Sequence, residues 1–181
     1  MSLNSFNSYK NLVPKKQCHS FNLTFRYIDD VLSLNNARFG EYLDTIYPSE
    51  LEIKDTTDSQ NFVNFLDLHL EIKNNGLFTS LYDKRDDFHF DIVNFPFLSS
   101  NIPSAPAYGV FVSQLVRYSR SSSIYSDFIK RSSSLATKLL KQGFQPCRLK
   151  HSFKKFYGRH HDLVDKYDRS MSTMSNDILG S

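Results

Sequence analysis

The sequence is poor in the residues that define several protein classes. It has no Trp and only two cysteines, Cys18 and Cys147, which are far apart in the chain. Two isolated cysteines form neither a disulfide framework nor a paired metal-finger pattern, so we expect free thiols in a reducing compartment. No apolar run approaches the roughly 18 residues of a membrane span, and the N-terminal segment lacks the apolar core of a signal peptide. These absences predict a soluble intracellular protein, cytoplasmic or nuclear, with no membrane partner.

The composition is otherwise that of a globular chain. Of the 181 residues, 40% are hydrophobic and 23% are charged, and 16 Phe with 10 Tyr supply bulky side chains for a core. Such a balance predicts one folded domain, or one domain with an appendage, rather than a disordered tail.

Charge is distributed unevenly along the chain. Residues 1–28 contain four cations and no acid, residues 29–91 contain fourteen acids against five cations, and residues 111–169 contain thirteen cations against four acids. An acidic middle followed by a basic third is expected where one part handles metal ions and another part handles a polyanion. The alternative is that these blocks are solvated surfaces without a ligand.

The segment 21–34 has the pattern of a β-hairpin. Apolar and polar residues alternate from Phe21 to Tyr27, and a second apolar run follows Asp29 and Asp30. This pattern predicts two antiparallel strands with two carboxylates at the tip. Adjacent acids at a tight turn repel each other, and Mg²⁺ would relieve the repulsion because it binds hard carboxylate oxygens together with substrate phosphates. A plain polar turn is the alternative interpretation.

The remaining pattern predicts an α+β fold in which strands precede helices. Residues 66–72 alternate as a strand of a second hairpin within 61–82, because Asn74, Asn75 and Gly76 tolerate the positive φ of a tight turn. Apolar residues at helical spacing predict a short helix before Pro48 and three longer helices in the C-terminal half. The predicted helices span 37–47, 108–118, 124–140 and about 149–157, and a further strand spans 51–54.

The string FRYIDDVL, residues 25–32, resembles the catalytic hairpin of reverse transcriptases. The resemblance continues through NFLDLHLEI, IPSAPAYGV and KFYGRHHDLV to reverse transcriptase-like sequences of mobile elements, particularly Penelope-like ones, and covers Phe25 to about Tyr167. It implies antiparallel β-hairpins of a partial polymerase palm followed by a helical thumb-like bundle. Under this resemblance the predicted segments are an N-terminal extension (1–20), a partial palm (21–91), a proline-containing connector (92–106), a basic thumb-like region (107–169) and a C-terminal tail (170–181).

The resemblance also implies roles for individual residues. Asp29 would ligate the catalytic Mg²⁺, Asp30 would support the metal site, and Tyr27 would face the incoming nucleotide or the primer end. Lys54 is a weaker candidate for a place near the leaving pyrophosphate. The implied chemistry is attack of a primer 3′-hydroxyl on a nucleotide α-phosphate.

The sequence lacks a part of the machinery that this chemistry needs. A polymerase of the family uses a third metal-binding aspartate on an upstream strand and a fingers region, whereas no Asp or Glu precedes Asp29. We therefore expect a truncated reverse transcriptase that is inactive alone, unless a partner chain supplies the missing palm and fingers.

The basic third predicts contacts with a phosphate backbone, such as that of an RNA/DNA hybrid. Its cations alternate with an apolar helical stripe and would point outward, although a solvated basic surface over an aromatic core is the alternative. One further hypothesis is a nucleic-acid-binding module that acts through the basic helices without catalysis, and another is a folded remnant with no activity. The predicted nucleic-acid-binding residues are Arg117, Arg120, Lys138, Lys141, Lys150, Lys154, Lys155 and Arg159.

Overall fold

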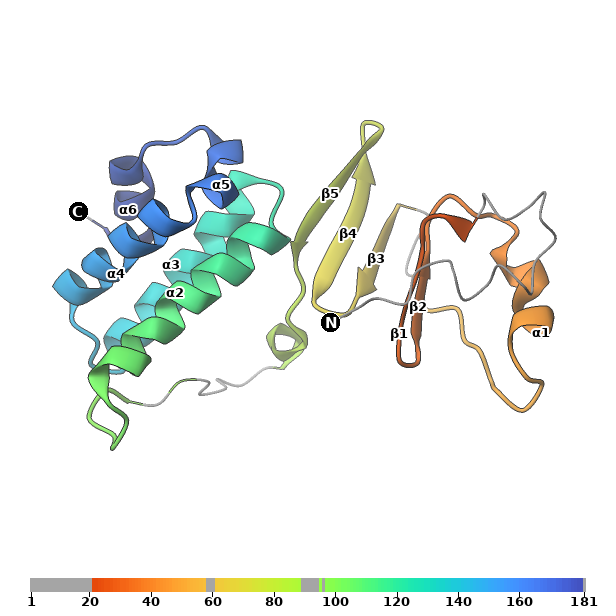
Figure 1. Cartoon of the computed structure of the whole chain (residues 1–181), viewed down its shortest axis with the longest axis horizontal. Coiled ribbons are helices and arrows are strands. Elements are labelled where there is room, and N and C mark those ends of the chain that lie inside the picture. Colours follow the sequence, from red (N-terminus) through yellow and green to blue (C-terminus); the bar gives the residue numbers. More distant parts are fainter. Residues whose placement is uncertain (1–20, 58–60, 89–94, 96, 181) are drawn as a thin grey trace. The chain divides into compact units, whose positions relative to one another are not determined.

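The chain divides into two compact units, residues 1–58 and 59–181. The computed structural model describes residues 21–57, 61–88, 95 and 97–180 (Figure 1). These residues form six α-helices and two small antiparallel sheets, which confirms the predicted α+β class. The predicted extension over 1–20, with Cys18, and residues 92–94 and 96 of the predicted connector lie outside the described residues.

The first unit contains the predicted hairpin of strands β1 (Thr24–Tyr27) and β2 (Asp30–Ser33). The two strands pair antiparallel from Thr24 opposite Ser33 to Tyr27 opposite Asp30. The hydroxyl groups of Thr24 and Ser33 hydrogen bond at 2.9 Å, so the buried Thr24 has a partner for its polar atom. The register leaves a two-residue turn at the tip.

The predicted helix over 37–47 is a 3-10 turn, η3 (Phe39–Tyr42), followed by one α-helical turn, α1 (Leu43–Ile46). Phe21 is fully buried and packs against Phe39, Tyr42 and Ile46. This cluster is small, and a two-stranded sheet is only marginally stable without further packing.

The predicted strand over 51–54 is wrong. Residues 51–57 form no regular secondary structure, and the side chains of Leu51 and Ile53 are 55% and 43% exposed. The alternating pattern needs the edge of a sheet to pair with, and no described strand pairs with this segment.

The second unit begins with a three-stranded antiparallel sheet of β3 (Phe62–Phe65), β4 (Leu68–Lys73) and β5 (Gly76–Leu81), in that order. Asn74 and Asn75 have φ of 50° and 59°, as a type I′ hairpin turn requires, which confirms the predicted turn. Leu66 does not continue the strand alternation. It lies in the turn between β3 and β4 with φ of 56°.

A 3-10 turn, η4 (Lys84–Asp87), follows the sheet, and the helical bundle then begins. The three predicted long helices are present as α2 (Ser104–Ser121), α3 (Tyr125–Lys141) and α4 (Pro146–Arg159). Gly143 adopts φ of 90° just after α3, and Pro146 opens α4. No described helix combines the length and the apolar character that a membrane span requires.

The C-terminal residues extend the bundle beyond the predicted boundaries. They form α5 (His161–Val164), η5 (Asp165–Tyr167) and α6 (Met171–Leu179). Met174 and Ile178 of α6 are 0% and 4% exposed, so the predicted tail over 170–181 contains a core helix. Strands β3 to β5, which the resemblance assigns to the palm, belong to the same compact unit as the helices.

Aromatic rings join the helices of the bundle. Phe128 of α3 stacks on Phe156 of α4, with ring centroids 6.4 Å apart, and on Tyr167 of η5 at 5.3 Å. All three rings are buried, and α6 closes the core with Met174. In Figure 1 the longer helices lie together as one bundle, and β5 is the strand nearest to them.

The C-terminal end of α2 is held by residues of η5. The ammonium of Lys166 donates to the carbonyl oxygens of Ser119 and Ser122 at 2.6 and 2.7 Å, and the hydroxyl of Tyr167 donates to Ser122 at 2.7 Å. Burial lowers the pKa of Lys166 and raises the pKa of Tyr167. The final carbonyls of a helix lack intrahelical partners, and a cation there also complements the helix dipole.

Two polar contacts fasten the sheet to the bundle. Ser123, between α2 and α3, pairs with Thr79 of β5, since its N–H donates to the Thr79 oxygen at 2.8 Å and its hydroxyl accepts from the Thr79 N–H at 2.9 Å. Arg131 of α3 donates to the carbonyl oxygen of Leu81 at 3.0 Å. The last strand is therefore bound at two points along its length.

Asp83 orders the chain directly after β5. Its carboxylate accepts two bonds from the Arg85 guanidinium, at 2.8 and 2.6 Å, and one from the Arg85 N–H at 3.1 Å. These bonds, with a smaller contribution from the positive charge of Arg131, lower the pKa of Asp83 to about 2.

The burial of Met174 predicts that α6 supports the bundle. We expect Met174→Ala to lower the free energy of unfolding by about 2–5 kcal/mol, because the substitution removes buried apolar atoms and leaves a cavity. Asn176→Ala, at an exposed position of the same helix, is the control and should change stability by less than about 0.5 kcal/mol. Urea unfolding of the full chain measures both. Equal effects of the two substitutions would show that α6 contributes little to the core.

The Asp83–Arg85 pair predicts a loss of stability in acid. The folded-state pKa of about 2 lies below the ordinary value of 3.8, so the unfolded chain takes up the proton first as the pH falls. The stabilisation is complete above about pH 4 and disappears as the pH falls toward about 2. Asp83→Asn should therefore lower the urea midpoint at about pH 6 and have little effect at about pH 2. An equal deficit at both pH values would refute this assignment.

Candidate functional site

The tip of the first hairpin presents the predicted carboxylates to solvent. Ile28 and Asp29 form the two-residue turn, and Asp30 is the first residue of β2, opposite Tyr27. Asp29 and Asp30 are exposed, and neither forms an ion pair with another described residue. The structure therefore places Tyr27, Asp29 and Asp30 together at one end of a hairpin.

The turn itself is strained at Ile28. This residue has φ of 53° although it is β-branched, and its side chain is 74% exposed. The Nε of Arg26 donates to the Ile28 carbonyl oxygen at 3.0 Å, and the Arg26 guanidinium lies 5.5 Å from the centroid of the Tyr47 ring. A neighbouring side chain thus stabilises a backbone conformation that isoleucine rarely adopts.

A turn of the same kind lies between β3 and β4, but its carboxylate is paired with a cation. Leu66 has φ of 56° and is followed by Asp67, as Ile28 is followed by Asp29. Asp67, however, accepts a hydrogen bond from the Nε of Arg117 at 3.1 Å and forms an ion pair with that guanidinium. The second turn docks its strand pair onto α2, whereas no cation of the described residues pairs with Asp29 in the first.

Asp29 and Asp30 are the candidate metal ligands that the sequence predicted at this hairpin. Among the described residues, no group of three or more His, Cys, Asp or Glu side chains could hold a metal ion. Two carboxylates suit a Mg²⁺ ion that keeps several waters and is completed by phosphate oxygens, rather than an ion bound by the protein alone. Lys54, the other residue implied by the resemblance, is 72% exposed and pairs with Glu52 at 3.3 Å.

In the helical unit, two adjacent helices carry cations and no acid. Helix α2 contains two arginines and α4 contains five lysines and arginines, and neither contains Asp or Glu. The two helices pack against each other. The acids of the bundle lie elsewhere, namely Asp127 in α3, Asp162 in α5, Asp165 in η5, Asp168 directly after η5 and Asp177 in α6.

The buried stripe of α4 separates its cations into two groups. Lys155 and Arg159 are four residues apart and lie on one flank of the stripe, whereas Lys150 and Lys154 lie on the other. Arg148 shares the flank of Lys155 at seven residues' spacing, and its guanidinium lies 5.8 Å from the centroid of the Tyr108 ring of α2. The flank of Lys155 and Arg159 therefore faces α2.

These exposed positions on two packed helices form a cationic surface, which we call the α2–α4 face. On α2, Arg120 points away from the buried residues, together with Gly109 and Ser113, whose small side chains leave the backbone accessible. The sequence analysis did not include Arg148, although its spacing from Lys155 on a helix was visible in the sequence. The α2–α4 face consists of the exposed residues Gly109, Ser113, Arg120, Arg148, Lys155 and Arg159.

The other predicted nucleic-acid-binding residues have different surroundings. Arg117 pairs with Asp67 and fastens the sheet to α2. Lys138 and Lys141 are exposed on α3, and Lys150 and Lys154 are exposed on the flank of α4 that does not face α2. The structure thus brings three of the eight predicted residues, Arg120, Lys155 and Arg159, onto one face.

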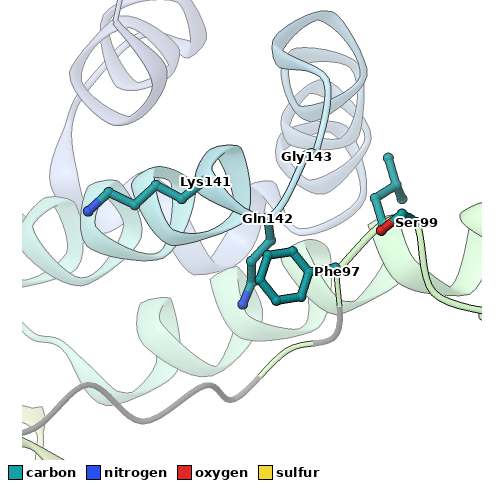
Figure 2. Close-up of a pocket in the computed structure, with 6 residues that line it drawn as sticks. Phe97, Ser99, Lys141, Gln142 and Gly143 are labelled. Carbon is teal, nitrogen blue, oxygen red and sulfur yellow. The ribbon is translucent and has the colours of Figure 1, made fainter.

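A shallow hollow lies where α3 ends (Figure 2). Its volume is about 470 Å³, and it is lined by residues of the connector before α2 and by the end of α3. The lining residues are Phe97, Leu98, Ser99, Lys141, Gln142 and Gly143.

Comparison of the chain with protein-family models, with curated proteins and with solved structures finds no match. The resemblance to reverse transcriptases therefore stays a prediction from the motifs.

The strain at Ile28 predicts opposite effects of glycine at two exposed aliphatic positions. Ile28→Gly should stabilise the hairpin by about 1–2 kcal/mol, because glycine adopts positive φ without a steric penalty. Leu23→Gly, at an exposed neighbour without positive φ, should destabilise it. Hydrogen exchange of the Leu34 amide, which donates to the Leu23 carbonyl oxygen at 3.0 Å, measures the local opening. Faster exchange in Ile28→Gly would show that the isoleucine is favourable at the tip.

Proposed function

We propose that this chain is a palm-and-thumb part of a reverse transcriptase of a mobile element, Penelope-like or related, which binds an RNA/DNA hybrid and does not polymerise by itself. The motif FRYIDDVL forms a hairpin with Asp29 in its turn, and a bundle of basic helices follows later in the chain. This order of elements agrees with the one that the resemblance implies. This agreement in the order of elements supports the proposal, and so does the chemistry of the α2–α4 face.

The α2–α4 face carries the binding part of the proposal. Four exposed cations, Arg120, Arg148, Lys155 and Arg159, lie along two adjacent helices that contain no acid. A surface of one sign without interspersed acids attracts a polyanion, and phosphate contacts of this type carry little base information. The exposed Gly109 and Ser113 between them allow close approach of a nucleic-acid backbone.

The hairpin carries the metal part of the proposal. Asp29 and Asp30 would hold a Mg²⁺ ion together with phosphate oxygens of the bound hybrid, and Tyr27 lies beside them. Such an ion, when bound, stabilises negative charge on phosphate oxygens. The further carboxylate implied by the resemblance is not found before Asp29 in this sequence, so Asp29 and Asp30 are two of the three implied metal ligands.

A nucleic-acid-binding module without catalysis is the second candidate. It is favoured by the small number of carboxylates at the hairpin tip, since no third described ligand joins Asp29 and Asp30. In this case the basic helices would account for all binding, and Asp29 would be a polar turn residue.

The proposal predicts salt-sensitive binding through the α2–α4 face. Fluorescence anisotropy of a labelled RNA/DNA hybrid should give an affinity that falls steeply with salt, because phosphate contacts release counterions. Removing Lys155 and Arg159 by substitution with Gln should weaken binding and reduce the slope of log K against log salt by about one for each cation. Lys73→Gln, at an exposed cation of β4, is the control and should leave the slope unchanged. Absence of binding at low salt would refute the proposal.

The same titration separates the two candidates. Under the first, Mg²⁺ strengthens binding of the hybrid more in the wild type than in Asp29→Asn, because the carboxylate helps to hold the ion. Under the second, Mg²⁺ changes the affinity of the wild type and of Asp29→Asn equally, by screening alone. Asp67→Asn is unsuitable as a control, because that carboxylate fastens the sheet to α2.

A further inference from the structure

Phe97 presents an aromatic ring at the edge of the hollow beside α3. Its side chain is 54% exposed, but its backbone surroundings are fixed. The Leu98 N–H donates to the Gln142 carbonyl oxygen at 3.0 Å, and the Gln142 side-chain amide donates to the Phe95 carbonyl oxygen at 2.8 Å. Hydrogen bonds of Phe95 and Leu98, which flank Phe97 in the sequence, therefore hold this segment against the end of α3.

The wall of the hollow combines open space with apolar and polar groups, which suits the binding of a flat ring. Gly143 has φ of 90° and no side chain, and the nearest heavy atom to a Cβ built there is Leu98 Cβ at 3.9 Å, so an open space lies over the glycine. Leu98 and Phe97 give apolar surface, and Ser99 gives a polar edge. Flat heteroaromatic groups bind such sites by stacking on an aromatic ring, with polar groups at their rim.

Charge around the hollow favours an anionic ligand with an aromatic part. None of the lining residues is acidic, and Lys141 is among them. Figure 2 shows the Lys141 side chain extending away from the Phe97 ring. Its ammonium would therefore contact a group attached beside the stacked ring and not the ring itself. An unpaired nucleotide of a nucleic-acid strand has this arrangement, with a base and a neighbouring phosphate.

The hollow lies at the end of the bundle where α3 ends and α4 begins. The loop that follows Gly143 leads directly into α4, and the N–H of Gln145 in that loop is bonded to the Tyr108 hydroxyl of α2 at 2.8 Å. The same Tyr108 ring lies beneath Arg148, the first cation of the face. A strand whose phosphates follow the α2–α4 face toward the start of α4 would therefore approach the end of the bundle that carries this hollow.

We infer that the hollow is a binding subsite for an unpaired nucleobase, with Phe97 as its stacking platform and Lys141 beside the adjoining phosphate. The inference rests on the proposed function, because the α2–α4 face delivers the strand to the hollow. The occupant is a single-stranded extension of a bound hybrid. A free nucleotide gains too little in so shallow a hollow to bind there alone.

Two RNA/DNA hybrids that differ only in a short unpaired extension test the subsite. The extension carries the fluorescent base 2-aminopurine, whose emission is quenched on stacking. We expect the extended hybrid to bind the wild type roughly fivefold or more tightly than the blunt hybrid, with quenched emission. Phe97→Ala should remove both effects and leave the affinity for the blunt hybrid unchanged, whereas Phe97→Tyr should retain them. Phe88→Ala, at another half-exposed phenylalanine outside the hollow, is the matched control.

The outcomes separate the subsite from the binding function. If both hybrids bind and Phe97→Ala changes neither the advantage of the extension nor the emission, the subsite is refuted and the α2–α4 face stands. If the wild type binds neither hybrid at low salt, the proposed function and the subsite both fail. If a free mononucleotide competes as well as the extension does, the occupant is a nucleotide and not a strand, which also overturns the inference.

Discussion

The stack of Phe128 between Phe156 and Tyr167 is the interaction on which the helical unit depends. One ring joins α3, α4 and η5, which are separated in the sequence. The position of Tyr167 in this stack also brings its hydroxyl, and the neighbouring Lys166, to the end of α2. The packing of the aromatic core and the termination of α2 are thus consequences of a single arrangement.

The separation of charge follows from this arrangement. The elements η5 and α6 carry Asp165 and Asp177, whereas α2 and α4 carry no acid. The acidic Asp177 of α6 accepts a hydrogen bond from Tyr125 of α3 at 2.6 Å, and burial together with this carboxylate raises the pKa of Tyr125. The cationic surface therefore depends on the tertiary packing of α2 against α4 as well as on the amino-acid composition of each helix.

Much of this fold was predictable from local pattern, and the failures have physical reasons. The hairpins and the three long helices follow from alternation, from Asn at positive φ and from apolar spacing. The segment 51–54 has strand propensity but no partner strand, which only tertiary structure can reveal. The helix at 171–179 was missed although its start is visible in the sequence, since Ser170 caps the N–H of Thr173 at 3.2 Å and apolar residues follow at helical spacing. The pairing of Arg117 with Asp67 joins residues far apart in the chain and could not be foreseen.

The orientation of α2 and α4 has an electrostatic consequence for the cationic surface. Tyr108 near the start of α2 meets Gln145 at the start of α4, so the two helices begin at the same end of the bundle. Neither helix has a side chain that caps its first N–H groups. The dipoles of two helices that start together add, and their positive ends reinforce each other. The helix dipoles therefore add positive potential at the end of the bundle where α2 and α4 begin, which is the end opposite Arg120 and Arg159.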